Sequence, residues 1–108
     1  MSGLDKVIAS RQLTCLIDGH RQEVEVNLGE SFADNGAVTC QYEILVGSES
    51  TVLGVSGIDG VQAIQLALFM VGSSLSSMKH ATDWRWANRE GSGFPSALEL
   101  PLFGQADE

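Results

Sequence analysis

Three stretches of alternating apolar and polar residues and a fourth, glycine-containing stretch come before one long apolar stretch in this chain. They cover residues 6–17, 22–28, 38–46 and 51–58. Alternation with a period of two is typical of half-buried β-strands. The dipeptide Asp18-Gly19, a strong hairpin signal, separates the first two stretches. Four strands with short connections predict an antiparallel meander that one helix covers on one face.

The long apolar stretch, residues 57–75, repeats with helical spacing instead. Asp59 and Gln62 form a capping-box pattern, which predicts that the helix begins near Asp59. The stretch is too short and too polar for a bilayer, which needs about 20 mostly apolar residues. Leu66, Phe69 and Met70 widen the apolar stripe beyond one face. The helix therefore needs a second cover, which is either the C-terminal tail or another protein chain.

Two aromatic residues and an apolar tail follow the helix. Trp84 and Trp86 stand at strand spacing with Arg85 between them. Either the indoles cap the edge of the core, or the three residues form an anchor at a protein interface, where Trp and Arg are enriched. Residues 94–103 contain two prolines and are expected to be extended. The prediction is a single α+β domain over residues 1–108, with an ordered core at about 5–103 and an extended C-terminal tail.

The composition narrows the range of partners. The net charge is −8, and the chain has six basic residues. This balance argues against nucleic acid and anionic membrane surfaces as partners and favours a basic protein. Between residues 18 and 59, eight acidic residues accompany Arg21 alone, a formal balance of −7. This is either a solvated charged sheet that resists edge pairing or a docking surface. The docking residues would be Glu23, Glu25, Glu30, Asp34 and Glu43.

The start of the chain has no signal-peptide pattern, so we expect a cytoplasmic protein. Cys15 and Cys40 both fall within apolar strand patterns. We expect two buried reduced thiols, although a cross-strand disulfide is the alternative.

No catalytic or metal-binding constellation stands out. His20 and His80 lack a neighbouring nucleophile motif, and the glycines form neither GxGxxG nor a P-loop. Asp18 with His20 is the one close pair of metal-ligand types, and a metal site needs at least three ligands. We therefore expect a non-enzymatic protein with no cofactor and no metal. An enzyme acting on a small ligand would need His80 or Tyr42 in a pocket between helix and sheet.

The segments DGVQAIQLALFMVGSSL, WRW and GFPSALELPLF together resemble a family of small bacterial domains of unknown function. In that family an aspartate and a glutamine open a hydrophobic helix, and a short GFP-type segment follows it. The resemblance covers roughly residues 40–103.

In size, charge and α+β build, the chain also resembles the immunity proteins of bacterial toxin and secretion systems. This second resemblance implies a protein that neutralises a toxin effector by occluding a basic surface on it. The acidic residues would steer the partner, and Trp84, Arg85 and Trp86 would anchor it. The alternative is a structural subunit or homodimer that packs through its apolar helix.

Overall fold

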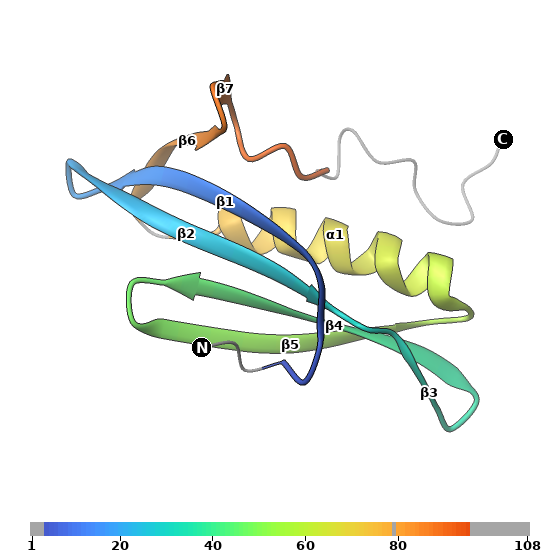
Figure 1. Cartoon of the computed structure of the whole chain (residues 1–108). Coiled ribbons are helices and arrows are strands. Elements are labelled where there is room, and N and C mark those ends of the chain that lie inside the picture. The colour runs from blue at the N-terminus through green and yellow to red at the C-terminus, as the bar shows by residue number, and fades with distance from the viewer. Residues whose placement is uncertain (1–3, 79, 96–108) are drawn as a thin grey trace, which may run out of the picture.

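The computed structural model describes residues 4–78 and 80–95 of the chain, which form a seven-stranded antiparallel sheet with one helix against one face (Figure 1). The elements are β1 (Val7–Ile17), β2 (His20–Gly29), β3 (Phe32–Asp34), β4 (Ala37–Val46), β5 (Glu49–Gly57), α1 (Gly60–Ser76), β6 (Ala81–Trp86) and β7 (Arg89–Glu90). The predicted α+β class is confirmed. The predicted count of four strands is wrong, because β3, β6 and β7 also belong to the sheet. Of the tail predicted at residues 94–103, residues 96–103 lie outside the described residues.

The four predicted strands do form a meander, in which β1 pairs with β2, β2 with β4, and β4 with β5. β3 continues the direction of β2 and pairs with the start of β4. After β5 the chain passes through α1 to the opposite edge of the sheet, where β6 pairs with β1. β5 therefore forms one edge of the sheet, and β6 with β7 forms the other.

Two hairpins owe their turns to residues with positive φ. Asp18 and Gly19 have φ values of 53° and 82°, and Asn35 and Gly36 have values of 51° and 82°. Two consecutive residues with positive φ characterise the type I′ turn, which matches the twist of paired strands. The first turn confirms the predicted hairpin. The second joins β3 to β4 between the predicted strands at residues 22–28 and 38–46, in a connecting segment expected to be a loop.

The helix begins where the capping pattern predicts. The backbone N–H of Gln62 donates to Asp59 Oδ1 at 2.9 Å, and Gln62 Oε1 accepts from the backbone N–H of Ile58 at 2.8 Å. Gly57 ends β5 directly against this turn, because a Cβ on it would lie 2.8 Å from the nitrogen of Ala63. Only a residue without a side chain permits this close approach of strand and helix.

The core lies between α1 and one face of the sheet, which we call the inner face. Alternate residues of β1, β2 and β4 meet small and branched residues of α1 there. The buried members are Leu13, Cys15, Val24, Val26, Cys40, Tyr42, Ile44, Ala63, Ala67, Val71 and Leu75. Cys15 and Cys40 are free cysteines, and burial raises the pKa of both thiols.

The second cover that α1 needs is present on one flank. The chain after β7 runs along the helix at Gly72, where a Cβ would collide with the backbone oxygen of Pro95. Leu66 and Phe69 are half-buried, and Met70 is 40% exposed. Residues 92–95 thus cover only part of the wide apolar stripe.

Candidate functional site

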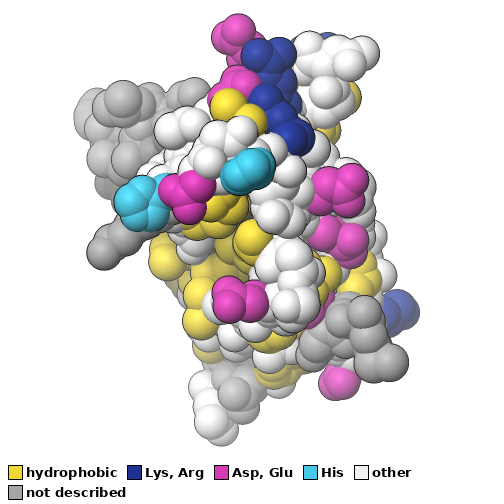
Figure 2. Space-filling view, turned by 90° about the vertical axis from the view of Figure 1, so that its left-hand side faces the viewer, with side chains coloured by type: hydrophobic (Ala, Val, Ile, Leu, Met, Phe, Trp, Pro, Cys, Tyr) yellow, Lys and Arg dark blue, Asp and Glu magenta, His cyan; other side chains and the backbone are white. Residues whose placement is uncertain are grey.

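The face of the sheet opposite α1, which we call the outer face, carries the best candidate for a binding site. Glu23 and Glu25 of β2 lie on it, and Glu23 is exposed. Both carboxylate side chains line a hollow of about 270 Å³. Its other lining residues are Gln12, Gln22, Val24, Leu45 and Gly47. In Figure 2 acidic side chains gather on the right-hand side, which is the side of the outer face.

The surroundings of Glu25 keep it ionised. Gln12 Nε2 donates to Glu25 Oε1 at 3.0 Å. Hydrogen bonds from Gln12 and then Asn27 hold the pKa of the Glu25 carboxyl below its usual range. Among the described residues, no salt bridge reaches Glu23 or Glu25. The hollow is therefore open to a positive group from another molecule.

Basic residues limit the acidic area at the end next to β6. Arg21 Nη2 lies 2.7 Å from Asp83 Oδ2, and Arg85 Nε lies 3.1 Å from Asp83 Oδ1. The hydrogen bonds from Arg21 and Arg85 lower the pKa of Asp83. These charges neutralise one another in part, so the acidic area consists of Glu23 and Glu25.

Glu43 does not belong to this surface, and the prediction that it docks a partner is wrong. Its exposed fraction is 0%. Asn27 Nδ2 donates to Glu43 Oε1 at 3.1 Å, and Ser50 Oγ donates to Glu43 Oε2 at 2.6 Å. Ser10 Oγ in turn donates to Asn27 Oδ1 at 2.6 Å. Glu43 is thus part of a buried polar network.

The strand pattern also does not reveal that another part of the chain lies on the outer face near Gly29. Residues 4–6, which lead into β1, lie across the outer face there, as Figure 1 shows at the start of β1. Leu4 is buried there, and a Cβ on Gly29 would meet both Leu4 and the backbone oxygen of Gln41. Alternation places Glu43 on the outer face correctly, but this part of the face is not open to solvent.

The remaining predicted acidic residues lie apart from Glu23 and Glu25. Glu30 is exposed and forms a salt bridge of 3.7 Å with Lys6. It stands seven residues after Glu23, which is about 20 Å along a strand. Asp34 ends β3 and pairs with Ala37. The five predicted acids therefore do not form one continuous surface.

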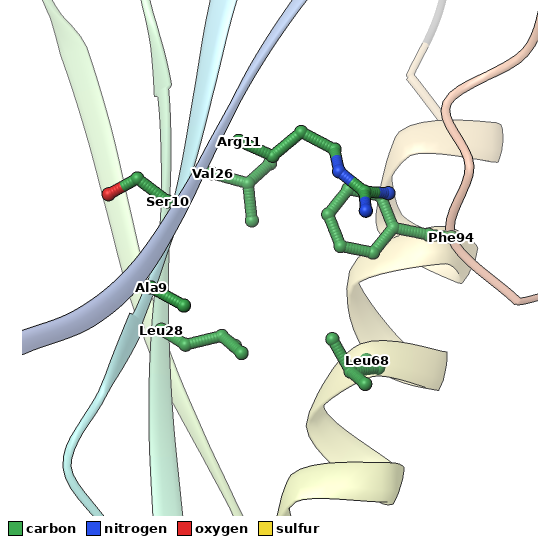
Figure 3. Close-up of a pocket in the computed structure, with 7 residues that line it drawn as sticks. All are labelled: Ala9, Ser10, Arg11, Val26, Leu28, Leu68 and Phe94. Atoms are coloured by element: carbon green, nitrogen blue, oxygen red, sulfur yellow. The ribbon is translucent and has the colours of Figure 1, made fainter. Parts of the chain in front are cut away.

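Trp84, Arg85 and Trp86, the predicted anchor, do not lie on one face of the sheet. Both indoles are half-buried and pack against the core, as the first interpretation predicted, whereas Arg85 is exposed. Trp86 stacks instead with Arg11, whose guanidinium carbon lies 3.7 Å from the indole centroid. The same carbon lies 4.6 Å from the centroid of the Phe94 ring (Figure 3). This stack closes the edge of the core.

Two cavities flank α1. A small one of about 110 Å³ lies beside the Arg11 stack and is lined by Val26, Leu28 and Leu68, while Ser10 points away from it (Figure 3). The other, of about 390 Å³, lies between α1 and strands β4 and β5. Its lining is mainly apolar, with Ile44, Val46, Leu53 and Met78, and Figure 2 shows hydrophobic side chains at this end of the molecule.

His80 and Tyr42, which an enzyme acting on a small ligand would need in a pocket, line neither of these two cavities. They do not line the hollow at Glu23 and Glu25 either. Within residues 4–78 and 80–95, no group of three or more His, Cys, Asp or Glu residues is placed to hold a metal ion. No helix in these ranges is long and apolar enough to cross a membrane.

Comparison with known families identifies the chain. The model of the domain of unknown function DUF6968 matches residues 9–96, and the chain belongs to this family. The predicted membership of a small domain family of unknown function is thereby confirmed. No curated protein and no solved structure matches the chain.

Proposed function

We propose that this member of the DUF6968 family is a non-enzymatic binding protein that receives a Lys or Arg side chain of a basic partner protein between Glu23 and Glu25. The observation that carries the proposal is the hollow of about 270 Å³ that both carboxylates line. A long basic side chain fits such a site because its apolar stem lies along Leu45 while its charge meets the acids.

Ion pairs with Glu23 and Glu25 would support recognition and fast association of a basic partner more than high affinity. An exposed ion pair contributes about 0.2–1 kcal/mol, so two acids alone give modest binding. The net charge of −8 adds long-range attraction for a basic surface. Such attraction raises association rates and weakens with salt, since the Debye length at physiological ionic strength is about 8 Å.

Among proteins that bind basic partners, we place this chain with immunity proteins that neutralise a cognate bacterial toxin in the cytoplasm by occlusion. The support is its small size, its acidic charge and its α+β build. In this proposal, the outer face covers a basic substrate-binding surface of the toxin. The partner is a protein, and neither nucleic acid nor a membrane is part of the complex.

Growth protection tests this function. Cells that express a toxin encoded next to this gene should grow when the chain is co-expressed. Protection should be lost when Glu23→Lys and Glu25→Lys are combined, because the hollow then repels a basic side chain. The matched control combines Asp5→Lys and Glu90→Lys, two exposed acids away from the hollow, and should protect.

The two parts of the proposal fail separately. If the unmodified chain does not protect against the neighbouring toxin, the immunity role is wrong. If the Glu23/Glu25 variant protects as well as the control, the acidic hollow is not the binding site.

A further inference from the structure

One edge of the sheet is left open, while the other is protected. β6 has a register shift against β1, is followed by a two-residue strand, and carries charges at Asp83 and Arg85. Such features prevent edge-to-edge pairing. β5 has none of them: its nine residues pair with β4 without a shift, and Glu49 is its one charged residue. Within the described part of the chain, β5 pairs only with β4.

Two neighbouring apolar side chains in the middle of this edge strand are exposed. Leu53 is 46% exposed and Val52 is 37% exposed. Leu53 also lines the cavity of about 390 Å³ between α1 and the sheet, so this cavity reaches the open edge. A long, exposed edge strand with a single charge at its first residue is a template for pairing with another strand.

One flank of α1 faces the same edge. On the other flank, Gly72 meets Pro95, and Leu68 lines the cavity that contains Phe94. Residues two positions apart point about 200° away from each other around an α-helix. Leu66 and Met70 therefore point toward the β5 side, where Met70 is 40% exposed.

We propose that a second copy of this chain binds the open edge, with the two β5 strands paired antiparallel across a two-fold axis. The two sheets become continuous, and the two copies of α1 lie side by side on the same face. α1 packs on both β4 and β5. With strands about 4.8 Å apart, each helix axis lies about 5 Å from the two-fold axis. The axes are then about 10 Å apart, which is the distance at which helices pack.

The strand sequence is compatible with its own copy. When the inner-face residues of both copies stay on the inner face, one residue of the strand must lie opposite the same residue of the other copy. We place Leu53 at this position because it is the middle residue of β5. Thr51 then lies opposite Val55, and Glu49 lies opposite Gly57. No like charges face each other, although each chain carries a net charge of −8.

The buried area is sufficient for a dimer of modest affinity. Nine residues extend about 30 Å, and one sheet layer with one helix layer is about 20 Å deep. Each copy therefore buries about 600 Å², and about 1,200 Å² in total is the lower bound for stable interfaces. Interfaces at the low end of this size range are typically weak, so we expect a dissociation constant on the order of micromolar.

Sedimentation equilibrium on the full chain tests the dimer. The unmodified protein should change from monomer to dimer as its concentration rises through the micromolar range. Leu53→Lys should remain monomeric, because each interface would contain two facing ammonium groups. Ile8→Lys is the matched control, since Ile8 is 47% exposed on β1, and it should still dimerise. A monomer at every concentration for the unmodified protein would overturn the proposal.

Cross-linking tests the register without relying on a destabilising charge. Leu53→Cys should form a disulfide-linked dimer on mild oxidation, because residue 53 faces its own copy. Thr51→Cys should not, since its two copies are about 13 Å apart, beyond disulfide reach. Equal linkage of both variants, or linkage of Thr51→Cys alone, would overturn the pairing. The Glu23/Glu25 charge-reversal variant should still dimerise, so this proposal and the proposed function fail independently.

Discussion

Replacing Glu43 by Ala tests the buried polar network most sharply. Sequence patterning treats this residue as an exposed acid, whose removal should change stability by no more than about 0.5 kcal/mol. In the structure its carboxylate is fully buried and accepts hydrogen bonds from Asn27 and Ser50. The sequence pattern and the structure therefore predict different losses of stability for Glu43→Ala.

The expected loss follows from the two donors. A hydrogen bond to a charged acceptor contributes about 1.5–3 kcal/mol, and a buried donor left without an acceptor costs about 1–3 kcal/mol. Ser50 is exposed and finds water after the substitution, whereas Asn27 is 1% exposed and loses its acceptor. Removal of the buried charge offsets part of this cost. We therefore expect Glu43→Ala to lower the free energy of unfolding by about 3 kcal/mol.

Urea denaturation at neutral pH measures this loss. With a slope of about 1–3 kcal/mol per molar urea, the midpoint should fall by at least about 1 M. Glu23→Ala is the control on the same face, because Glu23 is exposed, and it should shift the free energy of unfolding by no more than about 0.5 kcal/mol. Glu43→Gln keeps an acceptor for Asn27 and should lose less than Glu43→Ala. Equal stability of Glu43→Ala and Glu23→Ala would refute the reasoning.

Two further substitutions test the packing of the chain after β7 and the charges beside β6. Gly93→Ala should destabilise the fold by about 1–3 kcal/mol more than Gly91→Ala in urea denaturation. Both glycines have positive φ, so both substitutions strain the backbone. Of the two, only a Cβ at Gly93 meets other atoms, because it would lie 2.7 Å from Arg11 Nη1. Equal losses would show that this contact does not matter. Asp83 has a folded pKa below its usual value of 3.8, so its contribution to stability is present above that pH and is lost as the pH falls below it. The stability advantage of the unmodified protein over Asp83→Asn should therefore shrink between about pH 5 and pH 2 in thermal melts, and a constant difference would contradict this assignment.

The sequence was sufficient to predict the elements that depend on residues close together in the chain. The cap of Asp59 with Gln62 determines where α1 begins, and Asp18-Gly19 determines the first hairpin. The Asn35-Gly36 pair carries the same signal and would have revealed β3 inside the segment expected to be a loop. These features depend on neighbours within a few residues, so the sequence alone contains them.

The candidate site depended on contacts between distant residues, and the sequence predicted it only in part. Alternation places Glu23, Glu25 and Glu43 on one face, but it does not show that Glu43 is buried or that residues 4–6 lie across the same face. The stack of Arg11 on Trp86 joins residues 75 positions apart, and its sequence signal is a lone arginine at an inner-face position of β1. Side-chain spacing therefore identified the faces, whereas tertiary contacts decided which acids are available.

The affinity of the purified chain for the toxin encoded beside its gene, measured by calorimetry at low and high salt, tests the binding role of the Glu23–Glu25 hollow most directly. Combining Glu23→Lys with Glu25→Lys should weaken binding at low salt by about tenfold or more, while the Asp5/Glu90 control should change it far less. The difference should shrink at high salt because the charges are exposed. Unchanged affinity of the Glu23/Glu25 variant at low salt would contradict the account.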